Sequence, residues 1–287
     1  MSHHPSSVIR HPPQSGFTLV EIAIVLVIIG LIISGIVVGK DLIRASQLRA
    51  VATEVGRYTQ AVSDFRDKYL ALPGDFAGAV ALWGSPAAGC PSGASAAGDP
   101  ATATCNGNGD GRITIGGTIT TAAQYEQFRA WQHLANAGMI EGSYSGIQGG
   151  GAIPTDAKSQ YAVIGTNVPA SQLSGAGYAI ISLLSADVAG SNHYFTGINY
   201  MHLLQFGAAS SIATNYSTVA PILTTAEALS LDTKLDDGYP SSGKVMAPQK
   251  DSPYSGGCTN SDNVATTTIY DTTQTGYKCS LLFLLGF

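Results

Sequence analysis

An apolar stretch close to the N-terminus, residues 16–38, limits what this chain can fold into more than any other feature. The 23 residues from Phe17 to Gly39 carry one charged side chain, that of Glu21, and are long enough to cross a bilayer as a helix. A carboxylate this deep in an apolar segment is costly, so it usually has a partner or a function. We therefore predict a membrane-spanning helix with a functional acid near its start.

The helix is expected to continue as an amphipathic segment over residues 40–72. Apolar side chains recur there in steps of three and four, which places them on one helical face; they are Leu48, Val51, Val55, Tyr58, Val62, Phe65, Tyr69 and Leu72. Pro73 and Gly74 then end the pattern. A helix over residues 17–72 would be about 84 Å long. A coiled-coil stalk has the same spacing, but the large domain that follows, residues 73–287, favours packing of this face on a head.

Composition restricts what the head can be and what it can bind. Only 11% of the residues are charged, and the chain contains 34 Gly. This composition favours a sheet-and-loop domain with an uncharged polar surface over a highly charged disordered segment. Because the net charge is −5 and there is no basic run, we expect no nucleic-acid partner.

The four cysteines indicate the compartment in which the head folds. None forms a CxxC pair or sits beside a His at metal-binding spacing. Behind a membrane-targeting segment, two disulfides and an oxidising, extracytoplasmic location are the simpler interpretation. Of the three possible connectivities we favour the local one, Cys90–Cys105 and Cys258–Cys279. Free buried thiols are the alternative.

The head has several runs rich in β-branched and aromatic residues that alternate with turns. This pattern predicts an antiparallel sheet, and the runs cover residues 161–168, 178–184, 193–206, 244–247, 266–270 and 280–287. Together with the N-terminal segment, they predict an α+β fold in which a long helix packs on an antiparallel sheet.

Two short helices are also expected, over residues 121–138 and 224–238. Each opens with Thr followed three positions later by Gln or Glu, the pattern of a capping box, and each ends at Gly. His133 is expected on the surface of the first helix. The buried face of that helix is predicted to consist of Tyr125, Phe128, Trp131, Leu134 and Ala135.

The loop before the first of these helices contains a candidate calcium site. Asn106, Asn108 and Asp110 place oxygen side chains at alternate positions before a Gly, as in the first half of an EF-hand loop. The twelfth position, which should be an acid, is Gly117, so Glu126 could close the site only from elsewhere in the fold. The alternative is a turn rich in Gly and Asn without a metal.

A second candidate cation site follows the helix over residues 224–238. Asp232, Asp236 and Asp237 are close enough in the sequence to share a cation. A polar helix end followed by a tight turn explains the same residues without a cation.

The residues at the head of the apolar stretch resemble the type III signal of type IV pilins and type II secretion pseudopilins. Gly16, Phe17, Thr18, Leu19 and Glu21 all match at fixed spacing before an unbroken apolar segment. In that family the prepilin peptidase cuts after the Gly and methylates the new N-terminal residue. The resemblance implies that residues 1–16 are a leader and that Phe17 becomes N-methylphenylalanine. Some pseudopilins also bind calcium near the C-terminal region.

The resemblance also implies a role for Glu21. In the family's assembly model this carboxylate pairs with the terminal amine of a neighbouring subunit, which here is the amine of Phe17. Each charge offsets the desolvation of the other inside an apolar bundle, and losing one partner costs about 3–5 kcal/mol. The pair would therefore fix the register in which subunits enter a filament.

Function is expected to be structural. The sequence contains no GxSxG, HExxH or CxxC motif, so we do not expect an enzyme. The resemblance implies a homo-oligomeric filament, processing by the prepilin peptidase, an inner-membrane assembly platform, and storage in the inner membrane before export as an extracellular filament. A periplasmic type II secretion pseudopilus and a membrane-anchored periplasmic binding domain are the alternatives. The uncharged polar surface expected of the head favours the pilin.

Overall fold

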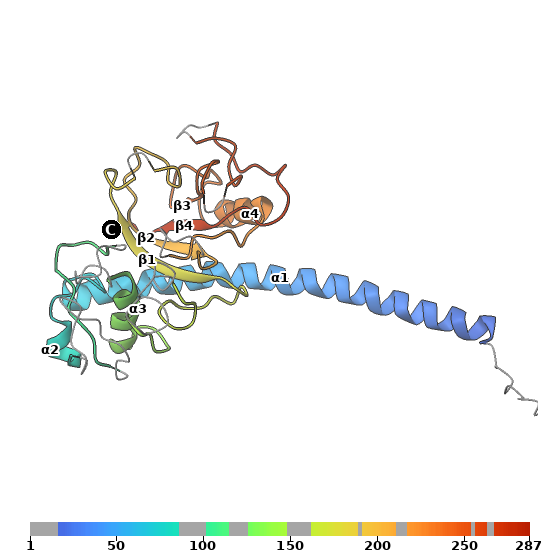
Figure 1. Cartoon of the computed structure of the whole chain (residues 1–287), viewed down its shortest axis with the longest axis horizontal. Helices are drawn as coiled ribbons and strands as arrows, with labels where there is room; N and C mark the ends of the chain where they lie inside the picture. Colours follow the sequence, from blue (N-terminus) through green and yellow to red (C-terminus); the bar gives the residue numbers. More distant parts are fainter. Residues whose placement is uncertain are drawn as a thin grey trace, which may run out of the picture. The chain divides into compact units, whose positions relative to one another are not determined.

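A computed structural model describes residues 17–85, 102–114, 126–147, 162–188, 191–210, 217–253, 256–262 and 267–287. The chain divides into two compact units between Ser46 and Gln47. This boundary falls within the longest helix, α1, which covers Leu19–Tyr69 (Figure 1).

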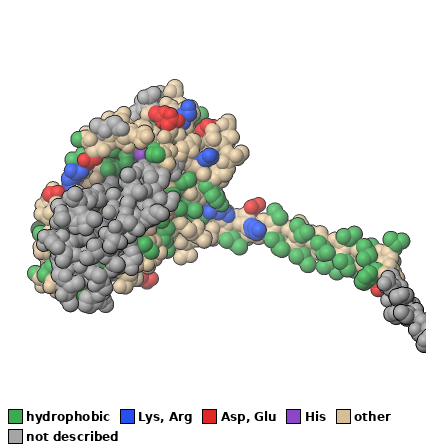
Figure 2. All heavy atoms as spheres, in the orientation of Figure 1, with side chains coloured by type: hydrophobic (Ala, Val, Ile, Leu, Met, Phe, Trp, Pro, Cys, Tyr) green, Lys and Arg blue, Asp and Glu red, His purple; other side chains and the backbone are tan. Residues whose placement is uncertain are grey.

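The N-terminal part of α1 is apolar on every side. Its large apolar side chains between Leu19 and Ile43 are at least 45% exposed, and Figure 2 shows apolar side chains along this part of the helix. Among the described residues, α1 is the one helix long and apolar enough to cross a membrane. Since a helix that is apolar all round is stable only when lipid or protein covers it, this part requires such a covering.

The C-terminal part of α1 packs one face into the head, as the apolar spacing predicted. Val51, Tyr58, Val62 and Phe65 are almost fully buried. The helix ends at Tyr69, three residues earlier than the sequence predicted, because the next residue takes a left-handed backbone conformation (φ 52°).

The head contains a four-stranded sheet in the order β1-β2-β4-β3, in which all neighbours run antiparallel. The strands are β1 (Gly177–Leu183), β2 (Met201–Gly207), β3 (Val245–Met246) and β4 (Leu281–Leu284) (Figure 1). The α+β arrangement predicted from the sequence is confirmed.

Several predicted strands are shorter than expected or are not regular strands. Residues 193–200, expected to belong to β2, form a loop instead, and β2 begins at Met201, whose φ is 53°. The run at 161–168 begins outside the described residues and otherwise contains only a bridge between Ile164 and Val168. The run at 266–270 likewise begins outside the described residues and contributes only the bridge of Tyr270.

Three short helices complete the described elements: α2 (Ala79–Trp83), α3 (Glu126–Asn136) and α4 (Thr225–Leu235). The capping box predicted for α4 is confirmed, with Thr224 and Glu227 bonded to each other's backbone. The capping residues predicted for the helix over residues 121–138, at positions 121 and 124, lie outside the described residues, as does Tyr125.

The core of the head lies between α1, α3 and the sheet. The ring of Tyr58 on α1 makes edge contacts with Trp131 of α3 and Tyr178 of β1, both at centroid distances of 5.0 Å. The carboxylate of Glu54, one turn before Tyr58, accepts hydrogen bonds from the Tyr178 hydroxyl (2.7 Å) and from Ser171 (2.6 Å). Aromatic packing and a buried carboxylate therefore join the helix to the sheet.

The prediction that His133 lies on the surface is wrong. His133 is fully buried, its Nδ1 accepts from the Gly74 amide (3.0 Å), and its Nε2 lies 3.2 Å from the Cys105 carbonyl oxygen. Burial, and then the charge of Arg129, lower its pKa to about 3, so the ring is neutral. A loop covers this side of α3, and helical periodicity in the sequence carries no information about that cover.

Candidate functional site

The first candidate site is the N-terminal end of α1, where Thr18 caps the helix. The Thr18 amide and hydroxyl donate to the same oxygen of Glu21, at 2.8 and 2.7 Å. The Glu21 amide donates in return to the Thr18 hydroxyl at 3.3 Å. This reciprocal arrangement is a capping box, in which an acid at the third helical position satisfies donors that the helix start would leave unpaired.

The capping box places the acid of the apolar stretch next to the predicted cleavage point. Phe17 directly precedes the cap and is 84% exposed. All three hydrogen bonds of the box are local and exposed, so the carboxylate can exchange them for another partner without disrupting packing. Glu21 was predicted to be functional, but the capping role of Thr18 was not predicted, although the Thr-x-x-Glu spacing is visible in the sequence.

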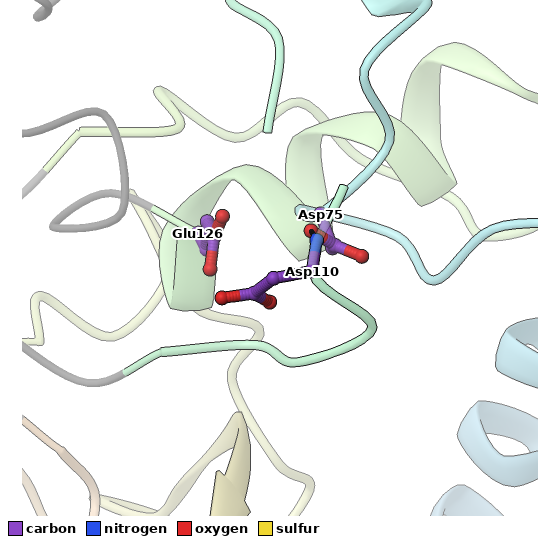
Figure 3. Close-up of side chains that lie close together, drawn as sticks. All are labelled: Asp75, Asp110 and Glu126. Carbon is purple, nitrogen blue, oxygen red and sulfur yellow. Dashed lines mark hydrogen bonds between the residues drawn. The ribbon is translucent and has the colours of Figure 1, made fainter. Parts of the chain in front are cut away.

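A second candidate site is an acidic cluster in the head, formed by Asp75, Asp110 and Glu126. One carboxylate oxygen from each residue lies within 4.8 Å of the other two, and Figure 3 shows the three side chains close together. Asp75 follows α1, Asp110 lies in the loop at residues 102–114, and Glu126 is the first described residue of α3. The fold thus brings Glu126 next to Asp110, as closure of the predicted loop site would require.

The structure differs from the predicted calcium loop in its other members. The side-chain oxygen of Asn106 accepts from the Val80 amide of α2 (2.8 Å). Asn108 donates its side-chain amide to Asp110 (3.0 Å). Asp75 was not predicted to belong to this site, because no spacing in the sequence relates it to residues more than thirty positions away.

Each carboxylate of this cluster also has a structural role. The Asp75 oxygens accept from the amides of Asp110 (3.0 Å) and Gly111 (2.9 Å), and Glu126 accepts from Asn108 and Thr114. Burial is the largest cause that raises the pKa of both Asp75 and Glu126. The three acids could hold a cation such as calcium, and the hydrogen bonds alone also account for their positions.

The loop at residues 102–114 approaches the chain after α1 closely. A Cβ atom on Gly107 would lie 2.2 Å from the backbone of Asp75. Only glycine fits at this position, and the close approach is what places Asp110 beside Asp75.

The predicted cluster of Asp232, Asp236 and Asp237 also comes together, with oxygens within 4.8 Å. Asp232 accepts from the Tyr270 hydroxyl (2.7 Å) and the Gly238 amide (3.0 Å). Burial, followed by the charges of Asp237 and Asp236, raises the pKa of Asp232 to about 6, although its two hydrogen bonds act in the opposite direction.

The other two acids of this cluster hold the turn that follows α4. Asp236 accepts from the amides of Lys244 and Val245, and Asp237 accepts from the Tyr239 amide (2.8 Å). A cation could bind here, and the turn hydrogen bonds by themselves explain the cluster.

Three of the four cysteines lie among the described residues, and all three are disulfide-bonded. The structure contains the Cys258–Cys279 disulfide, the local pairing favoured by the sequence analysis. Cys105 is also disulfide-bonded, and Cys90, its predicted partner, lies outside the described residues.

Comparison with known proteins bears on the N-terminal site. Residues 12–37 match the family described as the prokaryotic N-terminal methylation motif. No curated protein and no solved structure matches the chain. The matched residues include the predicted cleavage point, the capping box and most of the exposed apolar part of α1. The chain therefore carries the N-terminal signal of type IV pilins and pseudopilins.

Proposed function

We propose that this chain is a structural subunit of a type IV pilus-like filament that polymerises through α1. The methylation motif marks it as a pilin-type or pseudopilin-type precursor, processed by the prepilin peptidase and associated with the membrane. The observation that carries the proposal is the position of this motif on a helix whose N-terminal part is apolar all round. Lipid can cover such a helix before assembly, and neighbouring helices can cover it in a filament.

Each segment of the chain has its own proposed role. Residues 1–16 are removed, residues 17–39 provide the membrane and filament-core helix, and residues 40–72 connect it to the head at 73–287. In the filament the carboxylate of Glu21 leaves its own capping box and pairs with the methylated amine of Phe17 on a neighbouring subunit. The exchange is reasonable because the box consists of local, exposed hydrogen bonds.

The choice of an extracellular filament over a periplasmic pseudopilus rests on the head. Only 11% of the residues in the chain are charged, and the head is rich in Ser, Thr and Gly, a composition that suits exposure outside the cell. The pseudopilus is the second candidate, and the test below separates the two.

The test is expression in a bacterium that has prepilin peptidase and a pilus assembly system. Sheared surface fibres and membranes are separated, and the protein in each is examined by intact mass and N-terminal sequencing. The expected result is long fibres whose subunit begins with N-methylated Phe17. The same terminus found only in membranes would favour the pseudopilus, and a chain that still starts with its leader would refute the proposal.

Glu21→Gln separates processing from assembly, because it keeps the shape of the side chain but removes the charge. We expect the variant to be cleaved and methylated normally but to yield at least tenfold fewer fibres, since a stranded amine costs several kcal/mol. Asp41→Asn is the matched control on the same helix, because Asp41 is also exposed, and it should assemble normally. Normal fibres from Glu21→Gln would refute the proposed pairing.

A further inference from the structure

The head contains a cavity of about 570 Å³ at the C-terminal end of α1. Its walls come from the last turn of α1, the loop after it, the loop at residues 109–111, the start of β2 and Phe287. This volume lies within the range of small-molecule sites, about 300–1,000 Å³. The cavity is separate from the N-terminal site that supports the proposed function.

The apolar wall of the cavity includes a leucine in an unfavourable position. Leu70 is 90% exposed and has a φ of 52°. A left-handed backbone is unfavourable for a residue with a side chain, and the exposure of this apolar side chain adds to that cost. A ligand in the cavity would cover Leu70 and give its position a function.

Two aromatic rings, those of Phe76 and Phe287, complete the apolar wall. Phe76 is fixed by an edge contact with Phe65 in the core (6.0 Å). Phe287 is fixed by the Arg66 guanidinium, whose central carbon lies 4.6 Å from the ring centroid. Rigid aromatic walls favour a flat or ring-shaped ligand, because ring–ring contacts add to the gain from burial.

The cavity also presents a positive charge. Arg66 forms no ion pair with any described residue, and the described ion pair nearby joins Arg112 to Asp187. Because the guanidinium lies over a ring and not against a carboxylate, its N–H donors can still bind an anion. Burial first, and then the charges of Arg66 and Arg112, lower the pKa of His202, so this wall residue is neutral at pH 7.

The acid in the wall does not neutralise this charge through direct contact. The two carboxylate oxygens of Asp75 accept hydrogen bonds from the amides of Asp110 and Gly111 in the loop at residues 102–114. Arg66 remains the group that can bind a ligand's charge.

We propose that this cavity binds a small aromatic monocarboxylate. The carboxylate binds to Arg66, and the ring packs among Leu70, Phe76 and Phe287. A neutral aromatic compound of the same shape binds more weakly, because it lacks the charge that Arg66 recognises.

The test is equilibrium dialysis of the full chain in detergent micelles against radiolabelled 3-phenylpropionate, with protein-free micelles as the blank. The matched probe is 3-phenylpropionamide, which has the same ring and chain but no charge. We expect saturable binding of the acid at one site per chain, and binding of the amide weaker by about tenfold, as expected for loss of a charge-assisted hydrogen bond.

Three variants identify the site. Arg66→Gln should weaken binding of the acid about tenfold and remove the preference for acid over amide. Lys68→Gln is the matched control, because Lys68 is an exposed cation two residues away that does not line the cavity. Leu70→Gly relieves the left-handed backbone, so it should raise the melting temperature while weakening binding of both probes.

Leu70→Gly is expected to raise the melting temperature and to weaken binding. Weaker binding by this variant therefore cannot be explained by a loss of folding. Three results would each overturn the proposal: no saturable binding up to about 10 mM, equal binding of acid and amide, or wild-type affinity in Arg66→Gln. Because α1 residues 19–43 play no part in this cavity, binding can fail while fibres form, and fibres can fail while binding persists.

Discussion

Replacing Glu54 by Ala tests how α1 is held in the head. Glu54 is 7% exposed and accepts three hydrogen bonds, from the Ser171 hydroxyl (2.6 Å), the Gln172 amide (2.8 Å) and the Tyr178 hydroxyl (2.7 Å). The substitution leaves the donors of Gln172 and Tyr178 without this acceptor, and each such loss costs about 1–3 kcal/mol. Removing a buried carboxylate also relieves its desolvation, so we expect a net loss near 3 kcal/mol in the free energy of unfolding.

A loss of this size corresponds to a decrease of about 6–12 °C in the melting temperature of a domain as large as the head. The measurement is thermal and urea unfolding of the full chain in detergent, followed by near-ultraviolet circular dichroism, to which Trp131 and Tyr178 in the core contribute. A double-mutant cycle with Tyr178→Phe should give a coupling energy of at least about 1 kcal/mol.

The matched control is Asp64→Ala, because Asp64 is an exposed acid on the same helix whose recorded bond is to Gln60. It should change stability by less than about 0.5 kcal/mol. Equal stability of Glu54→Ala and Asp64→Ala, or a cycle with Tyr178→Phe that gave no coupling, would show that Glu54 does not hold α1 in the head.

Three further predictions concern the cap, the buried histidines and the disulfide. Thr18→Ala should destabilise the start of α1 by about 0.5–2 kcal/mol while Thr18→Ser does not, measured as faster amide hydrogen exchange in the first turn. His133 and His193 both have pKa values of about 3 because they are buried. Their contribution to stability is complete above pH 6.5 and falls by up to about 1.4 kcal/mol per pH unit for each ring as the pH decreases toward 3. His133→Gln should therefore reduce the slope of unfolding free energy against pH between 6 and 4, and an unchanged slope would contradict this. Replacing Cys258 and Cys279 by Ser opens a loop of 21 residues and should cost about 3 kcal/mol in urea unfolding.

The parts of the fold that could be predicted from the sequence are those with a local cause. The apolar stretch and the stripe after it predicted α1, and the Thr-x-x-Glu pattern predicted the start of α4. The β-branched and aromatic content of residues 178–184 predicted β1 to within one residue. In each case the residues that form the element also determine it, so spacing was sufficient.

The errors occurred where a distant segment decides the environment. His133 was placed on the surface because it lies off the predicted apolar face of α3, yet Glu126–Leu134 are all buried. Loop residues 104–105 cover the helix and provide the polar partners of His133. The prediction of the acidic cluster was incomplete for the same reason. Asp75 lies next to Asp110 only because the loop packs closely against the Asp75 backbone at Gly107.

The length of β2 was overestimated, because the apolar residues before Met201 lie in a loop and not in a regular strand. The aromatic residues Phe195 and Tyr200 contribute to the strand-like composition of residues 193–206. Both side chains are fully buried. The Tyr200 hydroxyl accepts from the Phe195 amide (2.9 Å), and Gln249 donates to the carbonyl oxygens of His193 and Tyr194, so this backbone is bonded without strand pairing. The apolar and aromatic composition of this segment reflects the burial of its side chains, and buried side chains can lie in a loop as well as in a strand.

Two of the carboxylates of α1, those of Glu21 and Glu54, show how one helix can serve both the proposed assembly and the folding of the head. Glu54 is buried and its three partners lie more than a hundred residues away in the sequence, so a change of partner would open the core. Glu21 is exposed and its partner is three residues away, so a change of partner costs only a helix cap. A carboxylate that must exchange partners between chains needs a local, replaceable bond, and one that fixes the head needs distant bonds that form together. The position of each acid along α1 matches the requirement of its proposed role.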